Sequence, residues 1–325
     1  MSQQPNSSDE IVSARGKKNV VHPAIPYAFL TEKERLSNGK VEECVTIFLT
    51  NRECAFRCLM CDLWKNTTDF TVTDADLEQQ FTTAFDKLGI VAGLNSDRQI
   101  KIYNSGNFFD PKSIPAPSVA AVAARINRYG FGNTIVENHP KLCDHRVVQM
   151  ADRLENGLEI AMGLETVHPV VLPRLNKKMT TADFQNATQF LLSHEIKVRA
   201  FILLKPPFLS EEQGVEWALK SIDFAFKNGV ECCAVIPTRK GNGIMDSLPE
   251  GQFSEPALSS LESVSQHGLG LCRSGQRLFV DIWDAERFSK CSHCFEQRSA
   301  RLNEMNLRQV VLPEVDCPKC SSLNQ

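Results

Sequence analysis

The chain has 325 residues, of which 42% are hydrophobic and 23% charged, and its formal net charge is −3. This composition is typical of a soluble globular protein, with room for one large α/β domain or two smaller ones. No apolar run approaches the roughly 20 residues that a membrane-spanning helix needs, and Met1–Ser13 has no apolar signal core, so we expect a cytoplasmic protein without a membrane partner. The small net charge gives no overall attraction to nucleic acid, but it does not exclude a local basic groove that binds one.

The twelve cysteines do not indicate a disulfide framework. Seven of them lie in short-spaced clusters of a long chain, a pattern that favours metal binding in a reducing compartment. The remaining five are interpreted as scattered core residues: Cys44, Cys143, Cys232, Cys233 and Cys272.

In chain order, residues 1–19 are polar, and we expect them to form a flexible N-terminal segment. After them, apolar runs of strand length alternate with amphipathic stretches. This alternation predicts βα units around a parallel sheet, either a barrel or an open wound sheet. The expected strands are residues 45–50, 99–104, 133–137, 158–164, 198–204 and 232–236. The expected helices are residues 118–128, 145–154, 181–192 and 211–226.

Polar motifs follow each expected strand, and in a parallel barrel the carboxyl ends of the strands meet at one mouth. Cys54, Cys58 and Cys61 follow the first strand with CxxxCxxC spacing. Because electron-transfer clusters usually take four cysteine ligands, three thiolates suggest a 4Fe-4S cluster with one iron left open for a substrate or cosubstrate. The alternatives are a zinc site with one distant ligand and buried cysteines without a metal.

The stretch from Thr50 to Trp64, including Phe56 ahead of the second cysteine, resembles the cluster loop of radical S-adenosylmethionine (SAM) enzymes. That resemblance implies that Cys54, Cys58 and Cys61 bind the cluster, that the open iron chelates SAM, and that one electron cleaves SAM to a 5′-deoxyadenosyl radical. It also implies an electron donor such as a flavodoxin or ferredoxin.

The position after the second strand is where these enzymes place a small motif that binds the amino group of SAM, and Ser105, Gly106 and Asn107 lie there. Glu137 and Glu165 end the third and fourth strands, and either carboxylate could accept ribose hydroxyl hydrogen bonds. The open alternatives are a plain turn for the first motif and, for the glutamates, salt bridges to one of four arginines: Arg52, Arg57, Arg199 or Arg239.

Near the C-terminus, Cys291 and Cys294 form one CxxC pair and Cys317 and Cys320 form another. Two such pairs match a four-thiolate zinc site, with an auxiliary iron-sulfur cluster or unliganded cysteines as alternatives. The segment between the pairs is read as a solvated helix or as a basic contact surface.

Further motifs look like the radical SAM subunit of archaeosine synthase and its bacterial relatives: residues 136–140, 163–166, 175–180 and 201–211. This resemblance implies a partial (β/α)6 TIM-like barrel of class α/β with a small four-cysteine extension, acting on a modified nucleoside of tRNA. A related metabolite, another tRNA base or a peptide stays open, as does a non-catalytic zinc-stabilised binding module or an iron-sulfur scaffold. We expect a tail over residues 1–24, the barrel over 25–285 and a zinc-ribbon-like extension over 286–325.

Overall fold

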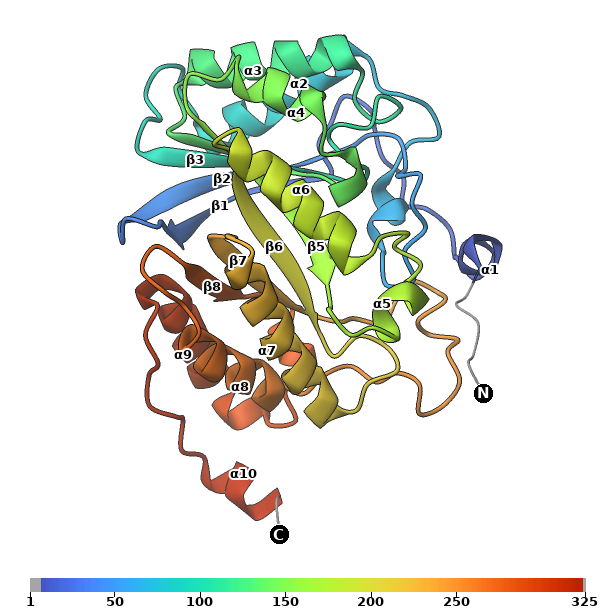
Figure 1. Cartoon of the computed structure of the whole chain (residues 1–325), viewed down its shortest axis with the longest axis vertical. Coiled ribbons are helices and arrows are strands. Elements are labelled where there is room, and N and C mark those ends of the chain that lie inside the picture. Colours follow the sequence, from blue (N-terminus) through green and yellow to red (C-terminus); the bar gives the residue numbers. More distant parts are fainter. Residues whose placement is uncertain (1–6, 324–325) are drawn as a thin grey trace.

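A computed structural model describes residues 7–323 of the chain. Its centre is one curled sheet of eight strands in sequential order, in which β2 to β8 are parallel and β1 pairs antiparallel to β2 (Figure 1). The strands are β1 Ala28–Arg35, β2 Val41–Leu49, β3 Arg98–Asn104, β4 Asn133–Glu137, β5 Gly157–Glu165, β6 Lys197–Leu204, β7 Cys232–Pro237 and β8 Arg277–Val280. The six predicted strands correspond to β2–β7, and the predicted partial barrel of class α/β is confirmed.

The helices mostly cover the outside of this sheet, whereas the first and the last of those described lie away from it (Figure 1). They are α1 Ser8–Ser13, α2 Asp74–Leu88, α3 Ala116–Tyr129, α4 His145–Ala151, α5 Val171–Arg174, α6 Thr181–Ser193, α7 Glu211–Lys227, α8 Leu258–Leu269, α9 Ser292–Arg308 and α10 Pro318–Leu323, with short 3-10 turns η1 Leu63–Asn66, η2 Pro140–Leu142 and η3 Ala285–Phe288. Helices α3, α4, α6 and α7 match the four predictions, whereas the sequence interpretation missed α2 and α8. No helix in the described part of the chain combines the length and apolar character of a membrane span.

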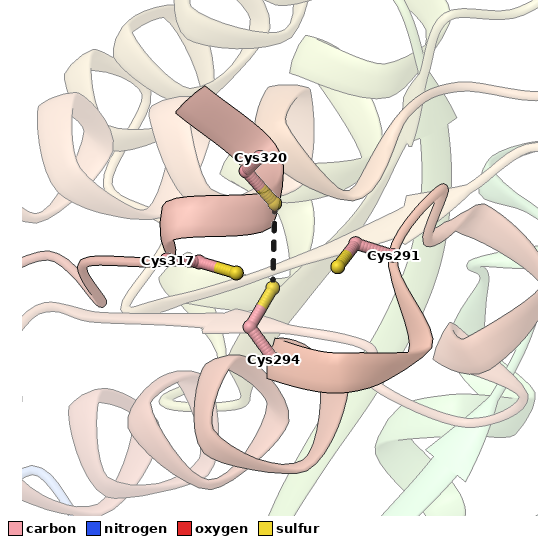
Figure 2. A group of neighbouring side chains, drawn as sticks. All are labelled: Cys291, Cys294, Cys317 and Cys320. Carbon is pink, nitrogen blue, oxygen red and sulfur yellow. Dashed lines mark hydrogen bonds between the residues drawn. The ribbon is translucent and has the colours of Figure 1, made fainter. Parts of the chain in front are cut away.

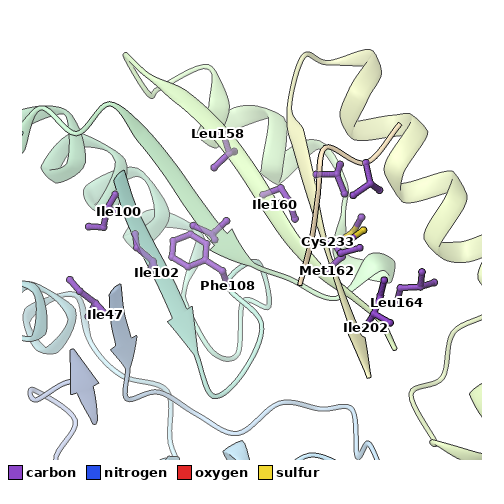
Figure 3. Packing of buried hydrophobic residues seen from close by; sticks show 14 of the residues in the cluster. Ile47, Ile100, Ile102, Phe108, Leu158, Ile160, Met162, Leu164, Ile202 and Cys233 are labelled. Atoms are coloured by element: carbon purple, nitrogen blue, oxygen red, sulfur yellow. The ribbon is translucent and has the colours of Figure 1, made fainter. Parts of the chain in front are cut away.

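The hydrophobic core lies between the outer face of the sheet and these helices. Ile47, Ile102, Ile160 and Ile202 point outward from β2, β3, β5 and β6 and are fully buried (Figure 3). Because side chains alternate along a strand, the residues between them face the inside of the curled sheet. The outer face is therefore the structural core, and the inner face is left for other contacts.

The N-terminal segment is more ordered than the sequence suggests. Ser7 caps α1, and Ile11 within α1 is 1% exposed in an apolar cluster with Leu59 of the cysteine loop. The guanidinium of Arg15 lies 2.6 Å from the carboxylate of Glu53 in the same loop. This part of the expected tail thus packs against the loop that carries three cysteines; residues 1–6 lie outside the described residues.

Helix α9 fills the gap between the first and last strands. The side-chain amide of Asn306 bonds both the N–H and the C=O of Val280, at 3.0 and 2.9 Å, and Gln309 does the same for Leu278, at 2.8 Å each. Arg35 at the end of β1 donates to a backbone carbonyl near the end of α9. These bonds satisfy backbone groups that edge strand β8 would otherwise leave unpaired.

Candidate active site and cysteine clusters

Cys54, Cys58 and Cys61 lie on the loop that follows β2, at the carboxyl-terminal mouth of the sheet. Burial raises the pKa of Cys58 to about 12. Burial, followed by the neighbouring Cys58 and Cys54, raises the pKa of Cys61 well above its usual value. Three thiols that disfavour each other's ionisation need a cationic centre to hold them as thiolates together, and a metal cluster supplies one. The donor set therefore fits a thiolate-ligated cluster.

Side chains from distant loops fix the backbone of this loop. Asn176, in a left-handed conformation with φ 52°, donates to the carbonyl of Arg57 at 2.5 Å. Asn242, after β7, donates to the carbonyls of Leu59 and Cys61 at 2.7 and 3.2 Å. The loop is therefore held by the segments that follow β5 and β7, although it belongs to β2 in the sequence.

Phe56, ahead of the second cysteine, stacks on the ring of His139 with centroids 3.7 Å apart and planes 6° from parallel. The Nδ1 atom of His139 accepts a hydrogen bond from the N–H of Lys141, so Nε2 carries the proton and donates to the carbonyl of Lys177 at 3.0 Å. Burial lowers the pKa of His139 to about 3, which keeps the ring neutral. His139 therefore supports the loop.

The Ser105–Gly106–Asn107 motif lies directly beside the cysteines. Asn107 donates from Nδ2 to the sulfur of Cys54 at 2.9 Å. A Cβ atom on Gly106 would lie 2.4 Å from Ser113 Oγ and 2.8 Å from Asn51 Nδ2, so only glycine fits between the ends of β2 and β3.

Buried polar atoms surround this motif. Both side-chain polar atoms of Asn51 and of Asn104 are buried and have no hydrogen-bond partner among the described residues. Buried amides of this kind are normally satisfied, so a polar ligand or water fits beside Gly106.

Glu137 and Glu165 end β4 and β5 as predicted, and the structure adds a lysine to them. Lys177 lies 2.5 Å from the Glu165 carboxylate, and both side chains are at most 10% exposed. Burial raises the pKa of Glu137 to about 7, Lys177 opposes that shift, and Glu165 adds to it. The three groups thus form one electrostatic unit beside Cys58, whose thiol also interacts with Lys177.

The salt bridges considered for the two glutamates do not form with the arginines named from the sequence. Glu165 pairs with Lys177 instead, and Glu137 has no ion pair among the described residues. Arg199 pairs with Glu34 and Glu159 in the interior of the sheet. The role of Lys177 was missed from the sequence because the polar residues considered lie directly after the strands, whereas Lys177 lies in the segment between β5 and α6.

Tyr27, before β1, was also missed. Its backbone N–H donates to the carbonyl of Phe48 at 3.0 Å, and burial and then the charge of Glu137 raise the pKa of its hydroxyl. Tyr27 has no motif around it, and only the antiparallel pairing of β1 with β2 brings it to the mouth.

The four C-terminal cysteines converge in space, from the start of α9 and from α10 (Figure 2). The sulfurs of Cys291, Cys294, Cys317 and Cys320 all lie within 4.8 Å of one another, and those of Cys294 and Cys320 are 3.5 Å apart. Backbone N–H groups of Cys294 and then His293 lower the pKa of Cys291 to about 7. The group is thus arranged to bind a metal ion.

No model of a known protein family matches the chain. It is 26% identical over 238 residues to archaeosine synthase subunit beta of Methanosarcina acetivorans, covering 70% of the chain and 67% of that protein. Two solved structures share its fold with a TM-score of 0.51, each over 72% of the chain. They are methylornithine synthase (PylB), at 14% identity over 63% of its length, and Elp3 of Methanocaldococcus infernus, at 16% over 58%.

The chain spans less than two thirds of those two structures. They share the partial barrel with this chain, which carries three neighbouring cysteines on the loop after β2. The sequence similarity, the shared fold and the cysteine loop together support the resemblance to radical SAM enzymes that the sequence indicates.

Proposed function

We propose that this protein binds a 4Fe-4S cluster through Cys54, Cys58 and Cys61 and uses it to cleave SAM reductively. When bound, such a cluster offers an open iron and one electron, which together generate a 5′-deoxyadenosyl radical from SAM. The proposal depends on one observation above all: three neighbouring thiols on a fixed loop at the mouth, the first of them bonded by Asn107 of the adjoining motif.

Each neighbouring group has a proposed role toward SAM. The Ser105–Gly106–Asn107 segment binds the amino group, since Gly106 lets the backbone come close and the unpaired amides of Asn51 and Asn104 lie beside it. Glu137 accepts from the ribose hydroxyls, and with a pKa near 7 it also donates a hydrogen bond when protonated. Glu165 is held in place by Lys177.

We further propose that the substrate is a modified tRNA nucleoside or a related metabolite. The support is the sequence similarity to archaeosine synthase subunit beta, at 26% identity. A small electron carrier such as a flavodoxin or ferredoxin is the proposed reductant.

The four C-terminal cysteines are proposed to hold one zinc ion. Tetrahedral zinc with bonds of about 2.3 Å keeps its four sulfurs about 3.8 Å apart. Sulfurs all within 4.8 Å fit this arrangement, whereas the separate iron corners of a cubane hold their cysteine sulfurs farther apart. The support is thus geometric and favours a single ion over a second cluster.

Anaerobic reconstitution followed by dithionite and SAM tests the enzyme proposal. The expected products are 5′-deoxyadenosine and methionine, from protein containing about four irons per chain. Cys58→Ala is expected to abolish 5′-deoxyadenosine and to lower the iron content, whereas Cys272→Ala, which lies in neither cluster, keeps both. An intact cluster that yields no 5′-deoxyadenosine would refute the proposal and favour an iron-sulfur scaffold.

A further inference from the structure

The inner face of the sheet carries aromatic side chains that the hydrophobic core does not use. Phe48 on β2, Tyr103 on β3 and Phe201 on β6 are half-buried, while their outward-facing neighbours Ile47 and Ile202 are fully buried. Phe48 and Tyr103 are direct cross-strand partners. Aromatic surface therefore stays accessible on the inner face.

These rings form a continuous series, here called the inner aromatic group: Tyr27, Phe48, Tyr103, Phe201 and Trp283. Successive ring centroids lie 5.5 Å apart for Tyr27 and Phe48, 5.8 Å for Phe48 and Tyr103, and 5.9 Å for Tyr103 and Phe201. Such spacings are typical of tilted and edge-to-face pairs and not of face-to-face stacks.

Trp283 is the most exposed member of the group and is nevertheless held in place. Its side chain is 58% exposed, and its ring lies 6.3 Å from that of Phe48. Its backbone N–H donates to Asp281 at 2.9 Å, and its carbonyl accepts from Arg239 at 2.5 Å. An indole left in water while its backbone is fixed is typical of a binding surface more than of a core.

Below the inner aromatic group, toward the amino ends of the strands, the interior is charged but internally neutralised. Lys101 pairs with Glu32 at 2.7 Å and with Glu34 at 2.6 Å. Arg199 pairs with Glu34 at 2.5 Å and with Glu159 at 2.6 Å. Arg277 lies 3.7 Å from Glu159, so three buried cations face three carboxylates; this floor therefore offers little attraction to a phosphate and suits an uncharged ring.

Above it, the inner aromatic group adjoins the candidate active site. Tyr27 donates its backbone N–H to the carbonyl of Phe48 at 3.0 Å, Phe48 lies at the end of β2 just before the cysteine loop, and Tyr103 lies two residues before Ser105 of the proposed SAM motif. A ring stacked on Phe48 or Trp283 would thus lie between the neutralised floor and the proposed site of radical formation.

We propose that the inner aromatic group binds the planar ring of the substrate, a nucleobase, by stacking. This inference rests on the proposed function and narrows its substrate to a molecule that carries a nucleobase. A base stacked on aromatic side chains needs no charged partner, and one stack contributes a roughly fivefold or larger gain in affinity.

The test uses cluster-loaded protein carrying Trp217→Phe, so that Trp283 is the only tryptophan among the described residues that is not buried. The four nucleoside monophosphates and bulk tRNA are titrated separately while tryptophan fluorescence is recorded, with ribose 5-phosphate as the probe that lacks a base. We expect at least one base-containing probe to quench Trp283 and ribose 5-phosphate to leave it unchanged. Quenching by a mononucleotide would show that a free nucleotide is sufficient for binding. Quenching by tRNA alone would show that the base binds only when it is carried in RNA.

Calorimetry then measures the affinity of that probe for variants. Phe48→Leu and Trp283→Leu are each expected to weaken binding at least about fivefold. Phe70→Leu, which removes an exposed phenylalanine outside the inner aromatic group, is the matched control and is expected to bind like the parent protein.

The proposal would be overturned by no quenching with any base-containing probe, by equal binding of ribose 5-phosphate, or by unchanged affinity in both leucine variants. Displacement of the probe by S-adenosylhomocysteine at the same site would also overturn it, since the rings would then hold the adenine of SAM. Formation of 5′-deoxyadenosine without substrate is measured in parallel, so failure of this inference is distinguishable from failure of the proposed function.

Discussion

Lys177 and Glu165 form a buried ion pair beside the three cysteines. A Cβ atom on Gly163 would lie 2.1 Å from the Glu165 carboxylate and 2.4 Å from Lys177 Nζ, so the pair packs directly on the backbone of β5. A buried pair of this kind contributes little net stability while both partners are present, because removing two charges from water is costly. Removing only one partner is strongly destabilising, because the other charge then stays buried without compensation.

Lys177→Met is therefore expected to lower the free energy of unfolding by roughly 3 kcal/mol or more. Urea unfolding checks this, with Lys178→Met as the control, because Lys178 is the exposed neighbour of Lys177. The double variant Lys177→Met/Glu165→Gln is expected to regain part of the loss. Equal stability of Lys177→Met and Lys178→Met would mean that the pair has no such role.

Among the elements, α1 has the most unexpected position. It is a helix of six residues, too short to be stable alone, so it depends on the burial of Ile11 and on the capping box of Ser7 and Glu10. Because Ile11 packs in the same apolar cluster as Leu59, the N-terminal segment covers one side of the cysteine loop.

Ile11→Ala is expected to release this segment locally without unfolding the barrel. Local opening exposes Arg15, which is otherwise paired with Glu53, to trypsin, so cleavage after Arg15 should accelerate about tenfold or more. Mass spectrometry of a timed digest measures the rate. Val12→Ala, at a neighbouring position that is 44% exposed, should digest like the parent, and identical rates for the two variants would contradict the packing role of α1.

At the scale of the whole molecule, α9 connects three features. It pairs with edge strand β8 through Asn306 and Gln309, bonds β1 through Arg35, and begins at two of the four C-terminal cysteines. A metal ion at these cysteines would therefore fasten the helix that closes the open side of the barrel.

Cys294→Ser is expected to remove one zinc ion per chain and to lower the Tm by roughly 5 °C or more, since structural zinc contributes directly to folding. Metal analysis and thermal unfolding of anaerobically purified protein check this. His293→Ala is the matched control, because His293 lies between the two cysteines, is exposed and is outside the four-cysteine group. Iron in place of zinc at this site, or loss of the ion in His293→Ala, would contradict the assignment.

The strands that sequence patterns predicted are those whose outer residues are strongly apolar, as in residues 45–50 and 198–204. β1 was missed because Glu32 and Glu34 face the interior, where Lys101 and Arg199 neutralise them, so its sequence reads as solvated. β8 was missed because it has only four residues. A local sequence pattern indicates whether a side chain packs against an apolar surface. It does not indicate that a charged side chain is buried and neutralised by residues of distant strands.

The sequence by itself determined the two cysteine clusters, the parallel βα organisation and the polar positions at strand ends, because these depend on spacing and on the alternation of apolar residues. Only the tertiary structure decided that Lys177 pairs with Glu165, that α1 packs on the cysteine loop and that five aromatic rings line the inner face. Those contacts join residues far apart in the chain, and closure of the sheet sets which of them meet. Their energies depend on burial and on distance, which no local pattern of residues encodes.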